Sequence, residues 1–341
     1  MPLRQIVQQY YPDGNVYIGA ATGMHKYSYT SGLMDREFSY LTPENDFKQH
    51  TIHPSPGKWS WDKSDAWVAH AAKHGQVIRM HGPISPQVSK WTLEDHRTAE
   101  ELSQNMDEYM TALCQRYNGH PVVKWMDVVN ETVVPKTGDW FGPKPGVSAW
   151  QNPWPLIGFD ETHPLRPPLY IKRAFEIATE HATDIELVLN QHGGMEPQAW
   201  DKVRQLVGYL REHGLRVDGI GWQAHVDLGW EKVPGNLEYY AELIDWAHTN
   251  QLSFHVTENT VWLRKDKDHA AQAETFAAIM RVLLSKRHSG VVTWNTWNIS
   301  DADSWKKEQH LDGCLFDYDY APKPAYYAVQ RVLLEIANAP Q

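Results

Sequence analysis

Residues 122–131 read VVKWMDVVNE. The run is apolar and rich in β-branched valine, which is typical of a strand buried on both faces of a parallel sheet. It delivers Asn130 and Glu131 directly at its carboxyl end. Because (β/α)8 barrels carry their catalytic groups at the carboxyl ends of buried strands, this stretch predicts both a fold and a place for an active site.

Similar apolar runs recur along the whole chain, and helical patterns lie between them. The expected strands are residues 16–20, 37–41, 76–80, 122–129, 185–189, 217–222, 253–257 and 290–294. The expected helices are residues 61–74, 96–117, 170–181, 197–213, 236–249, 269–287 and 322–336. Regular alternation of this kind indicates repeated βα units around a parallel sheet, and hence the α/β class.

Repeated βα units can close into a (β/α)8 TIM barrel or form an open, doubly wound sheet. No Gly-x-Gly-x-x-Gly pattern follows the first strand to bind a pyrophosphate, so the barrel is favoured. Residues 135–168 are rich in Pro, Gly and Trp and lack periodicity, which predicts a long loop after the fourth strand. We therefore expect residues 1–341 to form a single (β/α)8 catalytic domain.

The composition narrows the classes of partner. The net charge is −10 and no cluster of Lys and Arg stands out, which argues against nucleic acid or an anionic membrane as a partner. The 16 Trp residues suit a cleft that stacks on sugar rings, although a place in the core is the ordinary interpretation of any one of them. With 2 Cys there is no disulfide framework and no zinc spacing, and the oligomeric state is not indicated.

The first residues, MPLRQIVQQYYPDGNVYIG, lack the apolar segment of a secretory signal. No stretch of the sequence approaches the length of a membrane span. As written, the sequence predicts a cytoplasmic protein, or a secreted one if its amino terminus has been trimmed.

Polar or aromatic side chains follow nearly every expected strand. In chain order they are Glu44, Asn45, Lys48, His81, Asn130, Glu131, Asn190, Gln191, Gln223, His225, Glu258 and Trp297. Solvation of loop ends does not require so many, because polar atoms that become buried need partners. The carboxyl end of the barrel is therefore the expected site.

Glu131 and Glu258 both follow strongly apolar strands. Hydrolysis of a glycosidic bond needs two carboxyl groups, one to protonate the leaving oxygen and one to attack or stabilise the anomeric carbon; a separation of about 5–5.5 Å indicates retention of configuration. Either glutamate alone could equally pair with a barrel Arg or Lys. With Asn130, Gln223 and His225 as neighbours the pair favours catalysis, and His225 is expected to hydrogen-bond Glu258 and hold it ionised.

The remaining histidines give weaker signals. His70 and His74 have the i, i+4 spacing of metal ligands, but the sequence lacks the Glu of a HExxH motif between them, so a solvated helix face is the preferred interpretation. The same applies to His50 and His53. No metal site and no cofactor are predicted.

At these residues the chain resembles glycoside hydrolase family 10, the endo-β-1,4-xylanase family, from about residue 16 to residue 329. The segments that carry the resemblance are TPENDFK at 42–48, WMDVVNE at 125–131, GIGWQAH at 219–225, VTEN at 256–259, WNISDADSW at 297–305 and LFDYDYAPKPAYYAV at 315–329. Their order and spacing make chance agreement implausible. The resemblance implies a retaining hydrolase of β-1,4-linked xylan or xylo-oligosaccharides that needs no cofactor.

The resemblance also implies roles for individual residues. Glu131 is the expected acid/base and Glu258 the expected nucleophile, with Asn130 at the 2-hydroxyl of the sugar being cleaved. The expected substrate-binding residues are Glu44, Asn45, Lys48, His81, Gln87, Asn130, Gln223, His225, Trp297 and Trp305. Of these, Gln223 and His225 are expected to support the nucleophile, and Trp297 and Trp305 to form walls of the glycone side.

Three segments depart from the family pattern. After His81 the sequence reads HGPISPQVSKW, with Ser85 where the family has a second His and no preceding Trp. The nucleophile segment reads TENT, so Thr260 replaces an Asp, and the fifth strand ends in NQHGG where the family tends to have Asn-Asp-Tyr. These changes are expected to open the cleavage subsite, because an apolar wall discriminates against one extra group by only about 1–3 kcal/mol.

Other functions stay open at this stage. A family-like hydrolase with an altered cleavage subsite would act on another β-glycoside, such as a decorated xylan, a glucan or an aryl glycoside. A catalytically weak carbohydrate-binding protein would have lost its chemistry, although both glutamates are present. An isomerase or aldolase on the same barrel would need a Schiff-base Lys or a metal cluster at the strand ends, and the sequence predicts neither.

Overall fold

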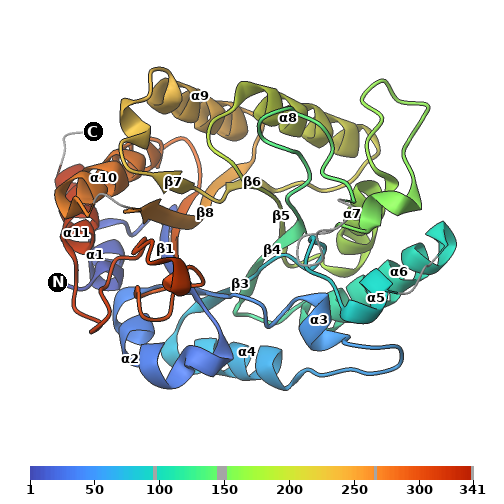
Figure 1. The fold of residues 1–341 in the computed structure, drawn as a ribbon, viewed down its shortest axis with the longest axis horizontal. Coiled ribbons are helices and arrows are strands. Elements are labelled where there is room, and N and C mark those ends of the chain that lie inside the picture. The colour runs from blue at the N-terminus through green and yellow to red at the C-terminus, as the bar shows by residue number, and fades with distance from the viewer. Residues whose placement is uncertain (95–97, 144–151, 265–266, 339–341) are drawn as a thin grey trace.

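The computed structural model describes residues 1–94, 98–143, 152–264 and 267–338. Within these ranges, eight parallel strands close into a barrel and helices surround it (Figure 1). In ring order the strands are β1 (Val16–Thr22), β2 (Tyr40–Pro43), β3 (Val77–Met80), β4 (Val123–Asn130), β5 (Glu186–Gln191), β6 (Gly219–Trp222), β8 (Ser253–Trp262) and β9 (Val292–Trp297). The pairings β6–β8 and β1–β9 close the ring, so the predicted (β/α)8 barrel is confirmed.

The helices lie outside the ring. They are α1 (Leu3–Tyr10), α2 (Tyr27–Glu37), α3 (Gln49–Ile52), α4 (Asp62–His74), α5 (Lys90–Glu94), α6 (Ala99–Tyr117), α7 (Leu169–His181), α8 (Pro197–Glu212), α9 (Asn236–Thr249), α10 (His269–Ser285) and α11 (Pro324–Ala337). Short 3-10 turns are η1 (Met24–Lys26), η2 (Trp154–Ile157), η3 (Trp230–Lys232) and η4 (Lys307–Gln309). No helix among the described residues is both long enough and apolar enough to cross a membrane.

Most expected elements are present, with specific errors. The strand expected at 37–41 begins later, because Glu37 ends α2 and the ladder of β2 starts at Tyr40. α1 was not expected from the sequence, although its buried Leu3, Ile6 and Val7 recur at helical spacing. α2 was not expected either, because Gly32 and β-branched Thr30 are poor helix formers, and packing overrides their preference.

The helix expected at 96–117 corresponds to α6, which begins at Ala99, and residues 96 and 97 lie outside the described residues. The start of α6 is a capping box in which the Thr98 hydroxyl accepts the Glu101 N–H at 3.2 Å. The Glu101 carboxylate accepts the Thr98 N–H in return at 2.8 Å. Two backbone donors that a helix start leaves unpaired are thereby satisfied.

The long loop expected at 135–168 does follow β4, and its residues 144–151 lie outside the described residues. The described parts are not wholly irregular. They contain η2, and Val133 bridges to Trp140 while Phe159 bridges to Pro168. The fully buried Trp154 of η2 donates its indole N–H to the carbonyl of Ser85 at 3.1 Å, which ties this loop to the segment after β3.

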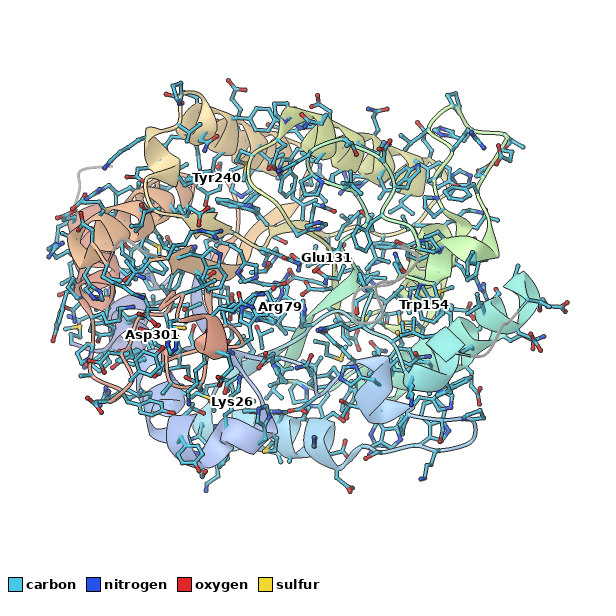
Figure 2. All side chains as sticks on the ribbon, viewed as in Figure 1. Lys26, Arg79, Glu131, Trp154, Tyr240 and Asp301 are labelled. Carbon is cyan, nitrogen blue, oxygen red and sulfur yellow. The ribbon has the colours of Figure 1, made fainter. Side chains whose placement is uncertain are left out.

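The barrel interior contains a buried charged pair. Arg79 of β3 donates to both carboxylate oxygens of Asp127 of β4, with Nε to Oδ2 at 3.0 Å, and both residues are fully buried. Figure 2 shows Arg79 and Glu131 inside the ring of strands. Asp127 also accepts from Nδ1 of His81 at 2.9 Å. The buried pair therefore orients His81, which follows β3 at the carboxyl end of the barrel.

Three non-glycine residues at the ends of strands have positive φ angles: Glu131 at 62°, Ala224 at 58° and Asn298 at 67°. This left-handed conformation is uncommon for residues with a Cβ and costs on the order of 1–3 kcal/mol at each position. All three lie just beyond the carboxyl ends of β4, β6 and β9. Three of the nine described non-glycine residues with positive φ therefore lie where the sequence predicts the site.

Candidate active site

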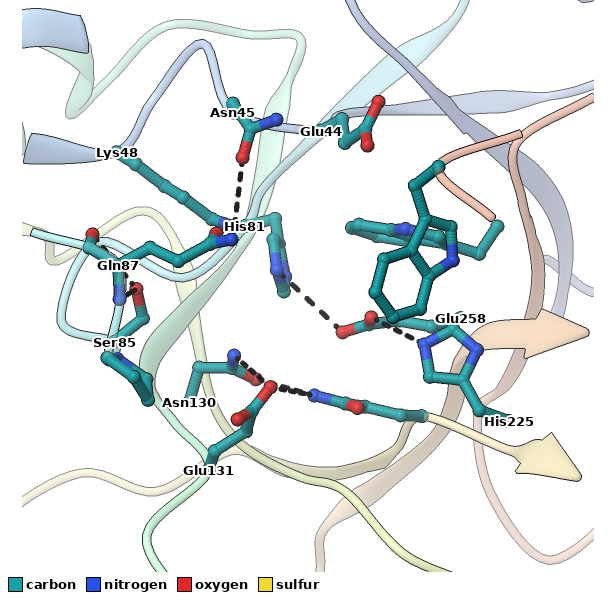
Figure 3. A pocket seen from close by; sticks show the side chains of 14 residues that line it. Glu44, Asn45, Lys48, His81, Ser85, Gln87, Asn130, Glu131, His225 and Glu258 are labelled. Atoms are coloured by element: carbon teal, nitrogen blue, oxygen red, sulfur yellow. Dashed lines mark hydrogen bonds and ion pairs between the residues drawn. The ribbon is translucent and has the colours of Figure 1, made fainter. Parts of the chain in front are cut away.

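One pocket at the carboxyl ends of the strands gathers the residues that the sequence singled out (Figure 3). It is lined by Glu44, Asn45, Lys48, His81, Ser85, Pro86, Gln87, Asn130, Glu131, Gln223, His225, Glu258, Trp297 and Trp305. All twelve predicted site residues are in this set, and Ser85 and Pro86 are additions to it. They come from segments between residue 44 and residue 305, which only closure of the barrel brings together.

Glu258 lies within β8 and is buried. Its Oε1 accepts from Nδ2 of Asn190 at 3.0 Å, and its Oε2 lies 3.2 Å from Nε2 of His225. Nε2 of His81 is 3.7 Å from Oε1. Burial raises the pKa of Glu258, but the charge of His81, the hydrogen bond and charge of His225 and the charge of Lys48 outweigh it, so that the pKa falls to about 2. Glu258 is therefore an ionised carboxylate.

The groups that contact Glu258 are themselves held in place. Nδ1 of His225 lies 2.8 Å from the Thr260 hydroxyl, across the pairing of the short strand β7 (His225–Asp227) with β8. Asn190 accepts the Thr257 hydroxyl at 2.8 Å and donates to Oδ1 of Asn130 at 2.9 Å. Each partner of the carboxylate therefore has one orientation fixed by a second hydrogen bond.

Glu131 lies on the facing wall and is partly exposed. Its Oε1 accepts from Nε2 of Gln223 at 3.0 Å and from Nδ2 of Asn130 at 3.3 Å. Both are amide donors, whereas Glu258 has two imidazole rings beside it. Gln223 was expected to support Glu258, and the structure places its amide against Glu131 instead. Figure 3 shows both carboxylates directed into the pocket.

The structure does not pair either glutamate with an arginine or lysine of the barrel among the residues that it describes. Across the described ranges, no lysine or arginine nitrogen lies within 4.0 Å of either carboxylate, and the ring nitrogens of His81 and His225 lie within that distance of Glu258. The two carboxylates are linked instead through the amides of Asn130 and Asn190.

A lysine and a glutamate form another part of the pocket. Lys48 is fully buried and donates to Oδ1 of Asn45 at 3.1 Å and to Oε1 of Gln87. Burial lowers the pKa of Lys48, while Glu258, Glu44 and Glu131 partly offset that effect. Glu44 accepts from Lys26 at 2.9 Å.

Two tryptophans form aromatic walls of the pocket. Trp297 is buried and its ring centre lies 4.9 Å from that of His81, whereas Trp305 is 37% exposed and lies 5.6 Å from His225. A neighbouring hollow shares Glu44, Asn45 and Trp305 with the pocket and continues toward Lys26, Tyr29 and Tyr320. The arrangement suits an extended ligand with flat apolar faces.

The three unusual segments each have a definite place. In the segment after β3, Ser85 and Pro86 line the pocket. The indole N–H of Trp91 donates instead to the carbonyl of His53, at 3.3 Å. No tryptophan of the described part of this segment reaches the pocket lining. Thr260 contacts His225, as described above. Gln191 after β5 accepts the N–H groups of Thr132 and Val133, both at 3.1 Å, and so fixes the chain beyond Glu131.

Three residues that the predicted site set omitted contribute to its geometry. Asn190 contacts Glu258 directly, and its position after the fifth strand was a usable signal. Asp127 orients His81, and its signal was a charge in the middle of an apolar strand. Thr260 was noted only because it replaces an Asp of the family pattern. Its contact with His225 could not be expected, because that contact depends on the pairing of β7 with β8.

Comparisons with known proteins agree over nearly the whole chain. The model of "Glycosyl hydrolase family 10" matches residues 5–332. The chain is 30% identical to endo-1,4-beta-xylanase A of Caldicellulosiruptor saccharolyticus, over 92% of this chain and 92% of the relative. It is 27% identical to endo-1,4-beta-xylanase B of Thermotoga neapolitana, over 98% and 92%.

Solved structures show the same likeness. Xylanase 10B from Thermotoga maritima superposes with a TM-score of 0.82 at 26% identity, covering 99% of each chain. Xylanase 10B from Thermotoga petrophila, solved in complex with xylobiose, also has a TM-score of 0.82 at 26% identity and covers 99% of this chain and 98% of its own.

Proposed function

The chain belongs to glycosyl hydrolase family 10, and from this premise we propose that it is a retaining hydrolase of β-1,4-linked xylan or xylo-oligosaccharides, with Glu258 as nucleophile and Glu131 as acid/base. The observation that carries the proposal is the pair of unlike carboxylates in one pocket. Glu258 is buried, ionised and contacted by two histidines, whereas Glu131 is partly exposed and contacted by neutral amides. Double displacement needs one carboxyl group that attacks and one that exchanges protons.

The proposed reaction has two steps. In the first, an oxygen of Glu258 forms a bond to the anomeric carbon while the glycosidic C–O bond breaks, and the departing oxygen takes the proton of Glu131. In the second, the Glu131 carboxylate takes a proton from water as the water oxygen attacks the same carbon. The bond to Glu258 breaks as the bond to the water oxygen forms, and both glutamates return to their starting states.

The surrounding residues have proposed roles that follow from their contacts. His225 and Asn190 hold the carboxylate of Glu258 in place, and His81, oriented by Asp127, lies on its other side. Asn130, between the two glutamates, is within reach of the 2-hydroxyl of the sugar being cleaved.

The remaining pocket residues are proposed to bind the substrate. Glu44, Asn45, Lys48 and Gln87 offer donors and acceptors for sugar hydroxyls, and Gln223 holds Glu131. Trp297 and Trp305 offer flat faces for the rings of the glycone side. None of these steps uses a metal or an organic cofactor, and the partner is an oligosaccharide or polysaccharide.

A second candidate is a family member that acts on another β-glycoside. The observation that favours it is the small Ser85 in the pocket wall, where the resemblance leads one to expect a histidine preceded by a tryptophan. A smaller wall leaves room for a hydroxymethyl group or another substituent, so decorated xylan, glucan and aryl glycosides are the alternative substrates. A weak carbohydrate-binding protein is less well supported, because both carboxylates and their partners are in place.

Azide rescue tests the assignment of the two glutamates. With an activated aryl glycoside, Glu258→Ala should abolish turnover, and azide should restore it with an inverted glycosyl azide as product. Glu131→Ala should also be rescued by azide, but with retained configuration, because Glu258 still attacks first. Glu186→Ala, which removes a half-buried carboxylate at the amino-terminal start of β5, at the opposite end of the strand from the pocket, should turn over without azide.

The opposite stereochemistry in the two rescued variants would exchange the assigned roles, and a lack of rescue in both would contradict the mechanism. Release of sugars from xylo-oligosaccharides, gluco-oligosaccharides and aryl glycosides distinguishes the two candidate substrates. A protein that gains thermal stability from these sugars yet releases no product would be a binding protein.

A further inference from the structure

Outside the barrel, away from the pocket, two helices bring three metal-ligand side chains together. His70 and His74 lie one turn apart on α4, and their rings stack with centres 4.3 Å apart. Asp35 on α2 faces both of them, with Oδ1 2.8 Å from Nε2 of His70 and Oδ2 3.2 Å from Nδ1 of His74. Figure 1 shows α2 and α4 as neighbours on the outer ring.

We propose that Asp35, His70 and His74 form a binding site for one divalent transition-metal ion of the zinc class, which links α2 to α4. One ligand atom from each residue lies within 4.8 Å of the other two. Two imidazoles and one carboxylate, with a fourth position open to water, are a donor set that zinc accepts, and imidazole also suits copper and nickel.

Two of the three donor pairs are close to the spacing that one ion requires, and the third pair, the two histidine nitrogens, lies within 4.8 Å. Zinc lies about 2.0–2.2 Å from its nitrogen and oxygen ligands, so donors around one tetrahedral ion are about 3.3–3.5 Å apart. The contacts of Asp35 with the two histidines, at 2.8 and 3.2 Å, are a few tenths of an ångström shorter. Rotation of exposed side chains supplies such a change, since Asp35 and His74 are 25% and 28% exposed while His70 is 6% exposed.

The surroundings support a cation at this place. Nδ1 of His70, the nitrogen turned away from Asp35, lies 2.9 Å from the hydroxyl of Tyr27, and metal-binding histidines commonly have such a partner on the second ring nitrogen. Arg4 donates to the backbone carbonyls of Asp35 and His74, at 3.1 and 2.8 Å, and so leaves the Asp35 carboxylate to the histidines. Asp35 and His74 also lie in the last turns of their helices, where the helix dipole favours positive charge.

Protons balance when the ion binds to neutral histidines. Without the ion, each ring donates an N–H to Asp35. With the ion, Nε2 of His70 and Nδ1 of His74 offer lone pairs, and the ring protons move to the other nitrogens. The His70 proton is then donated to the Tyr27 hydroxyl and that of His74 to water, so no net proton is released.

Zinc titration tests the proposal through binding and stability. By calorimetry the wild-type chain should bind one Zn²⁺ at this site with an affinity in the micromolar range, and its melting temperature should rise. Asp35→Asn and His74→Gln should weaken binding at least about tenfold and remove the shift. His181→Gln is the matched control, because His181 also ends its helix and lies beside a single carboxylate, Glu180, at 3.7 Å.

The pocket offers a competing place for zinc, since it too contains carboxylates and histidines. Glu258→Gln should therefore retain the binding and the melting shift. Wild type without saturable zinc binding would overturn the proposal, and so would Asp35→Asn and His74→Gln variants that bind as tightly as wild type. Binding that disappears only in Glu258→Gln would assign the ion to the pocket and also overturn it.

Discussion

At the scale of single residues, the two glutamates differ because their neighbours differ. Glu258 is buried, which by itself favours the neutral acid, yet His81, His225 and Lys48 lower its pKa to about 2. Relative to an ordinary glutamate this contributes stability at neutral pH, which is lost as the pH falls toward about 2. The same neighbours keep the proposed nucleophile ionised over the whole range in which a hydrolase works.

Replacing His225 by Ala should reveal this dependence. The variant lacks a hydrogen bond to the Glu258 carboxylate, and hydrogen bonds to charged groups are worth about 1.5–3 kcal/mol, so kcat/KM should fall by roughly ten- to a hundredfold. Because His225 lowers the pKa of Glu258, the acidic limb of the pH profile should move to higher pH. The measurement is kcat/KM across the acidic range. An unchanged limb would show that His225 does not control the charge of Glu258.

At the scale of elements, β3 and β4 are joined through the charged pair inside the barrel. Arg79 and Asp127 are each fully buried, and Asp127 also orients His81. A buried pair of this kind is costly to break, because the remaining charge has no water to replace its partner. The carboxylate of Asp127 therefore has two roles, because it pairs with Arg79 inside the barrel and orients His81 in the pocket.

Arg79→Met should lower the free energy of unfolding by about 3–5 kcal/mol, because Asp127 would be left buried without its cation. Arg264→Met is the matched control. It breaks an ion pair with Asp227 that is 61% and 57% exposed, and it should cost no more than about 1 kcal/mol. Urea unfolding measures both, and equal losses in the two variants would contradict the argument.

The start of α6 offers a second test at this scale. Thr98→Ala removes the hydroxyl that accepts the Glu101 N–H, and loss of such a cap costs about 1 kcal/mol. Thr98→Ser keeps the hydroxyl and should retain most of that stability. Urea unfolding of the two variants should separate them, and an alanine variant as stable as the serine variant would mean that water replaces the cap.

At the scale of the whole molecule, the two ends of the chain complete the barrel together. β1 pairs with β9, and α11 packs against α10 and α1. The Tyr11 hydroxyl donates to the carbonyl of Leu333 at 2.6 Å, and the Tyr326 hydroxyl donates to Glu37 at 2.9 Å. Contacts between residues this far apart in sequence support our proposal that the chain is a single domain.

A single domain should unfold in one cooperative step. Tryptophan fluorescence, circular dichroism and hydrolytic activity should therefore be lost at one denaturant concentration. A chain that ends before Pro324 lacks α11, leaves apolar surface of α10 uncovered and should show no cooperative transition. Separate transitions for different probes in the full chain would contradict the single-domain proposal.

The strands and most of the helices could be predicted because they depend on local patterns. Buried strands are short runs of apolar residues, and amphipathic helices repeat at their own period. α2 could not, because the first half of its sequence, YSYTSG, contains poor helix formers and packing overrides their preference. Most site residues could be predicted as a set, since they follow expected strands and all strands of a barrel end on one face. Gln87 and Trp305 were expected only from the family resemblance. The catalytic and binding roles of all the site residues stay predictions.

By itself the sequence determined the class of fold, the approximate positions of the eight barrel strands and most of the side chains that meet at one end. Only the tertiary structure decided how side chains contact one another. The amides of Asn130 and Asn190 hydrogen-bond to each other between the two glutamates, Thr260 contacts His225, and Asp35 contacts two histidines of another helix. The physical reason is that strand and helix patterns arise between residues close in the chain. These contacts join residues about 35 to 60 positions apart, which only packing brings within hydrogen-bond distance.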